Sequence, residues 1–516
     1  MTLLPLLGPA LLILTGLALI GRPVPRASRW LRLPEWVSLA SLVGFAVTTV
    51  GLVLNGPATS ALIGGSGVGL SVRVDPVSMV MGLLVSFMGW AVTRFAATYT
   101  DGETGQSAFM GRLCLALAAV LALVSAGNLV QLVIAWVAIG AVVNRLLLFY
   151  PDRPAARRAA RKKSLTGLAS SAAVLVAAAC LAAAYRTTDI ATILSASHAA
   201  QPVAVFVAAA LLALGAALKS ALAPSHGWLT EVMEAPTPVS ALLHAGIVNA
   251  GGFLLIRFAD VLLTSPGAMA ALVILGGFSA ALGGAVMLTQ PAVKTALAWS
   301  TLAQMGFMVM QCGLGLFSMA LLHIVAHSFY KAHAFLGAGG AVEAAVANRR
   351  PGPVAVPGMA DIGRSLALSL ALFAVAGSLV GIWHEAPQAL ALGLIVVMGL
   401  AYLVAQGLAG AAPRGLTLRL MPMAAGAALS YVLAQAAMAA ITHGTLPMPP
   451  APGPLEWLLL GLALGSFALI ALAQLTFPLW AGHPAVAGLR VHLMNGLYLN
   501  AVFDRWTGGW ERKGRA

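Results

Sequence analysis

Charged residues are scarce in this chain. Asp, Glu, Lys and Arg make up 9% of its 516 residues, whereas 60% are hydrophobic, and the mean hydropathy is +0.94. A soluble domain carries about 25% charged residues, so a large water-soluble fold is excluded. The composition predicts an all-α, polytopic integral membrane protein.

Cysteine is rarer still. The three cysteines, Cys114, Cys180 and Cys312, lie singly inside apolar runs, so no disulfide framework, CxxC pair or zinc knuckle can be drawn from them. Walker A and haem-attachment motifs are also missing. We therefore expect no cofactor, no ATP hydrolysis and no enzymatic step in this chain, and we expect its function to be transport.

Acidic residues are outnumbered by basic ones, 15 to 29, which gives a formal charge of +14. In a soluble protein this excess would suggest nucleic acid. Here the basic residues gather in short segments between apolar runs, near 22–32, 153–163 and 349–364. Such clusters mark cytoplasmic loops, which places the N-terminus outside and the C-terminus in the cytoplasm and excludes a nucleic-acid partner.

Apolar runs of the length that crosses a bilayer, about 17–25 residues, occur fifteen times. We expect about 13–15 transmembrane helices from them, packed closely because the chain holds 55 glycines. The runs lie near 3–20, 37–55, 77–97, 108–126, 128–149, 165–185, 202–222, 238–256, 267–288, 293–312, 316–338, 365–383, 388–407, 420–440 and 455–475.

The stretch from Lys219 to Arg257 places ionisable groups in hydrocarbon. Residues 202–218 carry no charge, Lys219 ends this run, three prolines interrupt the next segment, and His244 lies in the run that follows. Ionisable residues in a membrane are expensive and usually functional, and broken helices hold ion sites at membrane depth. We expect both residues to carry protons, the alternatives being a lysine that reaches the interface and a neutral core histidine.

A second group of ionisable residues comprises His323, His327 and Lys331, spaced i, i+4 and i+8 on one helical face. Two histidines at this spacing can bind zinc, but a neighbouring lysine repels a cation and no third ligand is evident. The pattern favours a proton path. Lys294, near a helix start, is either part of that path or an interfacial anchor.

One further pair, His384 and Glu385, lies between two apolar runs. It joins the path if the helix is broken there and the pair dips inward. The competing interpretation is a solvated pair in a loop near the outer surface.

The motif K-S-x-x-x-P-x-H-x-W-L…M-E-x-P-T-P-V-S-A-L-L-H-A, at 219–245, resembles the proton-conducting antiporter-like subunits. These are the L, M and N membrane subunits of respiratory complex I and the Mrp sodium/proton antiporters. The similarity continues in VDPVSMVMGLLV, VKTALAWSTLAQMGFM and HIVAHSFYKAHAFLGAG. It implies that Lys219 and Lys331 are the two central lysines and that His244 bridges two half-channels.

The resemblance also implies a domain organisation with two inverted repeats and discontinuous helices. We expect N-terminal helices over 1–107, a first repeat over 108–256 with a broken helix around 219–237, and a second repeat over 257–407. C-terminal helices and a cytoplasmic tail would occupy 408–516.

The sequence departs from the complex I pattern on the fifth apolar run. There the family has a glutamate directly after a tryptophan, and it pairs with the central lysine. In this chain Val137 follows Trp136, so we expect that Glu231 or Glu234 supplies the missing carboxylate, the alternative being that the coupling differs.

A second departure is the ending HLMNGLYLNAVFDRWTGGW, which leaves no room for the long lateral helix of the L subunit. The ending resembles the membrane subunits of the DAB inorganic-carbon accumulation systems. That likeness implies a bacterial cytoplasmic (inner) membrane protein that uses protons or Na+ to drive a partner accumulating bicarbonate from CO2. The implied partner is a large cytoplasmic DabA-like protein that resembles a zinc β-carbonic anhydrase and holds the zinc.

Two alternatives remain open. One is a subunit of a complex I-like NADH-quinone oxidoreductase or of an Mrp-type antiporter. The other is a membrane anchor for a catalytic partner, with the channel residues as relics.

Overall fold

The computed structural model describes residues 2–507 apart from 23–27, 66, 200, 341–342, 344–345, 347–356, 410–413 and 481. Parts of the basic segments 22–32 and 349–364 therefore lie outside the described residues. Helices make up nearly all of the described chain, which confirms the predicted all-α class.

Twelve helices or helical runs in the described part are long and apolar enough to cross a membrane, and all fifteen predicted runs lie on helices. The twelve are α1 (Leu7–Gly21), α2 (Leu33–Asn55), α3 (Pro76–Tyr99), α4 (Gln106–Val124), α5 (Leu129–Leu147), α6 (Pro154–Tyr185), the run that contains α10 (Thr237–Ala245) and α11 (Ala250–Arg257), α13 (Pro266–Met287), α17 (Met359–Val380), α18 (Pro387–Leu408), α19 (Arg414–Thr442) and α20 (Pro454–Leu475).

The other three predicted runs form α8 (Val203–Lys219), α14 (Val293–Gly313) and α15 (Phe317–Leu336). The first is 17 residues long and ends at Lys219. Lys294 lies on α14, and His323, His327 and Lys331 lie on α15. Short helices connect or follow these: α7 (Ile190–Ser197), α9 (Gly227–Thr230), α12 (Ala259–Leu263), α21 (Phe477–Trp480), α22 (Ala487–Met494) and α23 (Leu499–Trp506).

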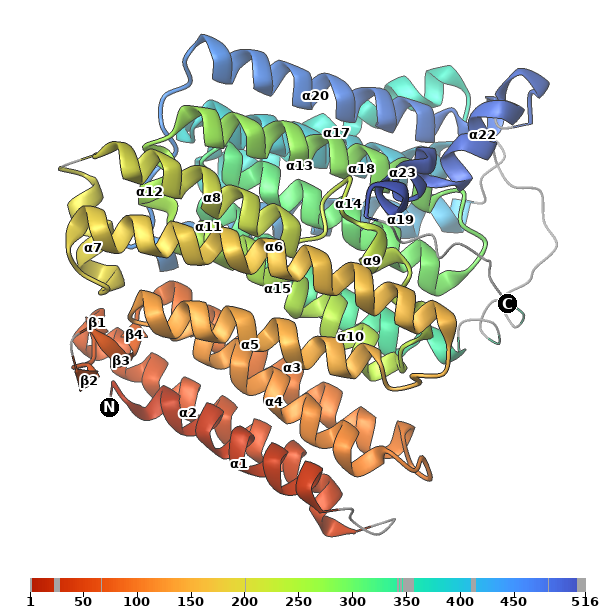
Figure 1. Ribbon diagram of the computed structural model, residues 1–516. Coiled ribbons are helices and arrows are strands. Elements are labelled where there is room, and N and C mark those ends of the chain that lie inside the picture. Colours follow the sequence, from red (N-terminus) through yellow and green to blue (C-terminus); the bar gives the residue numbers. More distant parts are fainter. Residues whose placement is uncertain are drawn as a thin grey trace.

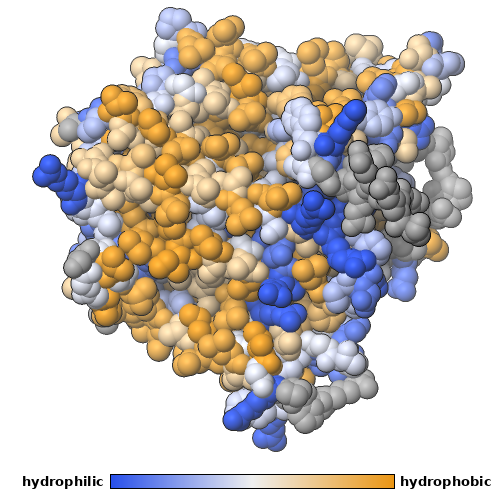
Figure 2. Space-filling model, in the orientation of Figure 1, coloured by the Kyte–Doolittle hydropathy of each residue, from blue (hydrophilic) through white to orange (hydrophobic). Residues whose placement is uncertain are grey.

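The helices lie roughly side by side in chain order, with α1–α5 at one flank, α6–α15 in the middle and α20 at the other flank (Figure 1). A broad hydrophobic surface covers the visible face, and hydrophilic residues gather toward its edges (Figure 2). Many large apolar side chains of the chain are exposed, for example that of Val203, which is 78% exposed. Such a surface fits a lipid environment and not water.

Two small antiparallel hairpins lie between α2 and α3. The strand β1 (Ala58–Thr59) pairs with β4 (Arg73–Val74), and β2 (Ile63–Gly65) pairs with β3 (Val68–Leu70). The hairpins sit near the N-terminus at one end of the bundle (Figure 1). They lead the chain into the start of α3.

Asp75 begins α3 and joins it to α11. Its Oδ1 accepts from the Ser78 backbone N–H at 2.8 Å, a normal N-cap, with proline at the first helical position. Its carboxylate also binds Arg257, the last residue of α11, at 2.5 Å, and Arg73 at 2.6 Å. Asp75 and Arg257 are 1% and 2% exposed, so a buried ion pair holds the two helices together.

Candidate functional site

The first lysine lies at the C-terminal end of α8. Ala221 has a left-handed backbone (φ +54°), and the Leu222 N–H reaches back to the Ala217 carbonyl at 3.1 Å, as in a Schellman end. Lys219 is therefore held in the last turn. The carbonyl groups there carry roughly half a negative charge, which stabilises an ammonium group.

Lys219 packs against α5 through Trp136. Its Nζ donates to the Trp136 carbonyl oxygen at 3.4 Å and lies 4.6 Å from the centre of the indole ring. The side chain is buried, where a cation–π contact is stronger than at the surface. The carbonyl groups at the helix end and the indole ring place negative potential around the Lys219 ammonium group.

The expected carboxylate pairing is wrong in the described part of the chain. Glu231 binds Lys162 at 2.7 Å and Glu234 binds Arg153 at 2.8 Å, and neither contacts Lys219. Both carboxylates follow the helix break and turn toward the basic start of α6. Val137 is 47% exposed, so this position lies on the outward face of α5.

Lys163 is a second lysine of this half, and the sequence analysis missed it. The basic segment 153–163 is not a loop, because α6 begins at Pro154, and Lys163 is buried and donates to the Gly140 carbonyl of α5. Gly140 lies one helical turn after Trp136, about 6 Å along the axis. Two features of the sequence could have indicated the burial of Lys163. It stands next to an apolar run, and its segment is rich in Ala and Arg, which are good helix formers.

Replacing Lys163 by methionine is expected to lower ion flux about tenfold. Lys163 and Lys219 bind carbonyl groups of α5 one helical turn apart, so a positive charge on one lysine favours release of the proton from the other to the next acceptor on the path. Flux per inserted protein in proteoliposomes measures this. Arg157→Met, an exposed cation on the same helix, is the matched control. Equal flux from both variants would show that Lys163 plays no part in conduction.

His244 is fully buried on α10. Its Nδ1 lies 3.0 Å from the Thr301 hydroxyl, and that hydroxyl donates its own proton to the Leu297 carbonyl at 2.9 Å. The hydroxyl must therefore accept from Nδ1–H. In the neutral ring, Nε2 is left as the proton-accepting atom, and Phe335 stacks on the ring at 4.4 Å.

Lys331 of α15 binds the same Leu297 carbonyl. Its Nζ donates to the Leu297 oxygen at 3.0 Å and to the Ser300 hydroxyl at 2.8 Å, so one turn of α14 joins Lys331 to His244. His327 donates from Nε2 to the His244 carbonyl at 3.0 Å. The structure thus brings His244, His327 and Lys331 together, through hydrogen bonds with the His244 carbonyl and with the Leu297 carbonyl of α14.

His323 lies one turn from His327, with 6.0 Å between the ring centres. It lines a cavity of about 660 Å³ between α13, α14, α15 and the helices α18–α20, and Ser300 lines the same cavity. The cavity extends from Ser300, which binds Lys331, to the C-terminal helices.

Three other predicted residues lie outside the buried cluster of His244, His327 and Lys331. Lys294, half-buried in the first turn of α14, donates to the Thr237 hydroxyl at 3.0 Å, and this hydroxyl donates to Tyr99. His384 and Glu385 are exposed at the end of η6 (Ile382–His384), apart from the buried cluster. Their placement agrees with a solvated pair.

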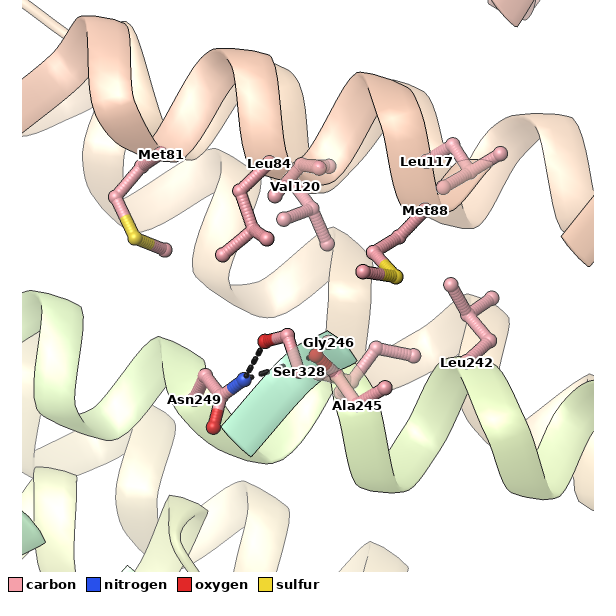
Figure 3. A pocket seen from close by; sticks show the side chains of 12 residues that line it. Met81, Leu84, Met88, Leu117, Val120, Leu242, Ala245, Gly246, Asn249 and Ser328 are labelled. Atoms are coloured by element: carbon pink, nitrogen blue, oxygen red, sulfur yellow. Dashed lines mark hydrogen bonds between the residues drawn. The ribbon is translucent and has the colours of Figure 1, made fainter. Parts of the chain in front are cut away.

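Asn249 is a further buried residue that the sequence analysis did not single out. It lies in η4 (Ile247–Asn249), where the helix is interrupted after Ala245, and its amide donates to the Ala245 carbonyl and the Ser328 hydroxyl, both at 2.9 Å. These bonds border a cavity of about 20 Å³ (Figure 3), room for about one water. Asn249 therefore links the interrupted helix next to His244 to α15 by a hydrogen bond.

Buried lysine side chains beside interrupted membrane helices are the features that this chain shares with the antiporter-like membrane subunits. A family model described as NADH:quinone oxidoreductase/Mrp antiporter, transmembrane, matches residues 126–405. The chain belongs to this family, which confirms the resemblance inferred from the lysine and histidine motifs.

A full-length relative supports the second likeness. The chain is 35% identical to the probable inorganic carbon transporter subunit DabB2 of Halothiobacillus neapolitanus, over 98% of this chain and 92% of the relative. The fold resembles a chain of the Mrp complex from Dietzia sp. (TM-score 0.65, 22% identity, 98% of this chain and 59% of that chain). It also resembles a chain of respiratory complex I from Thermus thermophilus (TM-score 0.55, 22% identity, 96% and 99%).

Proposed function

We propose that this chain conducts protons, or Na+ in their place, along a buried polar axis that runs through Lys163, Lys219, His244 and Lys331. The observation that carries the proposal is the shared Leu297 carbonyl. It binds both Lys331 and the Thr301 hydroxyl that holds His244. Ionisable side chains buried so deeply in a membrane protein mark an ion pathway.

His244 is suited to pass a proton between the two lysine centres. Its Nε2 is left to accept a proton while Nδ1–H is held by the Thr301 hydroxyl, so the ring can take up a proton at one nitrogen and release it from the other. His327 and His323 extend the second centre toward the cavity of about 660 Å³. Lys294, Glu231, Glu234, His384 and Glu385 are assigned to the approaches to this axis.

The conducting chain energises a partner, since an open conductor alone would only dissipate the gradient. We propose a complex in the bacterial cytoplasmic membrane, with the N-terminus outside, in which the partner is a large cytoplasmic DabA-like zinc protein that accumulates bicarbonate. The similarity to a probable inorganic carbon transporter subunit over 92% of its length supports this assignment. The zinc and the chemistry on CO2 belong to the partner.

Purification of the tagged chain from its native membrane in mild detergent tests the partner. The expected result is one large zinc-containing protein in constant ratio to this chain, with zinc measured by mass spectrometry of the intact complex. Recovery of quinone-oxidoreductase subunits, or of a set of Mrp subunits, would contradict the proposal and favour those complexes. The same preparation in proteoliposomes provides the reference ion flux.

A further inference from the structure

The C-terminal helix α23 holds two polar residues on its inner face, Asn500 and Asp504, one helical turn apart. Both contact Lys162 of α6: the Lys162 Nζ donates to Asn500 Oδ1 at 3.1 Å and to Asp504 at 2.7 Å. The Lys162 side chain is 2% exposed. A segment more than 300 positions away in the sequence thus supplies the carboxylate for a buried lysine.

Glu231 completes this cluster from the helix break. It accepts hydrogen bonds from Lys162 at 2.7 Å and from the Asn500 amide at 2.5 Å, and it forms an ion pair with Arg158 at 3.4 Å. The two cations and two carboxylates balance. Three elements that are distant in sequence (α6, α9 and α23) therefore meet in one ion-pair network, and such networks lose stability when one partner is removed.

The surface against which α23 packs leaves little free space. A Cβ at Gly227 would lie 1.7 Å from Asn500 Oδ1, and a Cβ at Gly496 would lie 2.6 Å from the Trp299 ring. Gly496 also has a φ of +58°, a backbone conformation that side chains disfavour. Close approach of this kind requires glycine at both positions, so the docked helix is a specific feature of the fold.

The network lies next to the first lysine centre. Lys162 and Lys163 are consecutive on α6, so their side chains point about 100° apart around the helix. Lys162 turns toward α23, whereas Lys163 donates to α5 one turn from the carbonyl that binds Lys219. The charge at Lys162 is therefore one residue away from the proposed ion path.

We propose that Asp504 and Asn500 are positioning residues for ion conduction, which act on Lys163 and Lys219 through Lys162 and Glu231. This inference rests on the proposed function. Asp504 neutralises Lys162, so its loss leaves an extra positive charge beside the lysine centre and opposes the arrival of a proton. A unit charge about 10 Å away, at an effective dielectric constant of about 20, shifts the protonation equilibrium of a lysine roughly tenfold.

The test compares Asp504→Asn with Asp504→Glu in the full chain. We expect Asp504→Asn to lower flux per inserted protein about tenfold in proteoliposomes, and Asp504→Glu to restore most of it because the charge returns. Asp152→Asn, an exposed carboxylate near the start of α6, is the matched control and should conduct like the original chain. The melting temperature of each variant separates a folding defect from a conduction defect.

If Asp504→Asn fails to insert, Asn500→Ala provides the second variant, since it keeps every charge and removes only the amide contacts. Its expected loss is about fivefold, the size of two weak hydrogen bonds, one with Lys162 and one with Glu231. Undiminished flux in a folded Asp504→Asn or Asn500→Ala variant overturns the inference and leaves the proposed function standing. An original chain that conducts nothing overturns both.

Discussion

Replacing Lys219 by alanine is expected to lower ion flux about 100-fold, the range that one positioned proton-transfer group contributes. The ammonium group is held between the end of α8 and the Trp136 ring, and no other described lysine occupies that place. Flux through the reconstituted chain under an imposed pH or Na+ gradient measures the effect. Lys331→Ala should cause a loss of similar size, because Lys331 links the Leu297 carbonyl to Ser300.

The control is Arg29→Ala, which removes an exposed cation outside the cluster and should conduct normally. Growth gives a second readout in cells that depend on this complex at ambient CO2. If both lysine variants insert, retain the partner and still support that growth, the conduction hypothesis is wrong. The chain would then be a membrane anchor for its partner.

Replacing Asp75 by alanine is expected to lower the free energy of unfolding by about 3–5 kcal/mol, the usual loss when one member of a buried ion pair is removed. The change leaves the Arg257 guanidinium buried without its partner and removes the N-cap of α3. Thermal or denaturant unfolding in detergent measures the loss. Asp152→Ala, an exposed carboxylate, should change stability by no more than about 0.5 kcal/mol.

The same carboxylate predicts a dependence on pH. Burial alone would raise the pKa of Asp75, but the charges and hydrogen bonds of Arg257 and Arg73 hold it well below its usual range. A carboxyl group with a lowered pKa in the folded state stabilises the fold above its unfolded pKa, about 3.9. That contribution is lost as the pH falls further, through the folded pKa. The stability difference between the original chain and Asp75→Ala should therefore be constant from pH 5 to 8 and shrink below about pH 4; a difference that grows in acid would contradict this account.

The sequence was informative where an unusual residue stands in an apolar background. Lys219, His244 and Lys331 were visible because each interrupts hydrophobic sequence, and the structure places all three in the buried interior. Lys163 escaped notice because it stands at the boundary between a basic segment and an apolar run. Only the extent of α6, which begins at Pro154, shows that this lysine is inside the bundle.

The partners of these residues were harder to predict. The missing carboxylate at Val137 was evident from the sequence, but its proposed replacement by Glu231 or Glu234 was wrong. Which partner a carboxylate binds depends on the direction that the chain takes after the helix break. Packing against α6 and α23 sets that direction. The compensation for Lys219 comes instead from backbone carbonyls and an indole ring, groups that carry no formal charge.

The sequence by itself determined three properties. It showed that this is a helical membrane protein, which of its apolar runs cross or enter the bilayer, and where the ionisable residues lie along those runs. These properties follow from the transfer free energies of single side chains and short segments, which are local. Only the tertiary structure decided which ionisable groups meet. Three sets of contacts each join segments that are distant in the sequence: those at the Leu297 carbonyl, those of Lys163 and Lys219 with carbonyl groups of α5, and those of α23 with Lys162. Such contacts depend on how the helices break and pack.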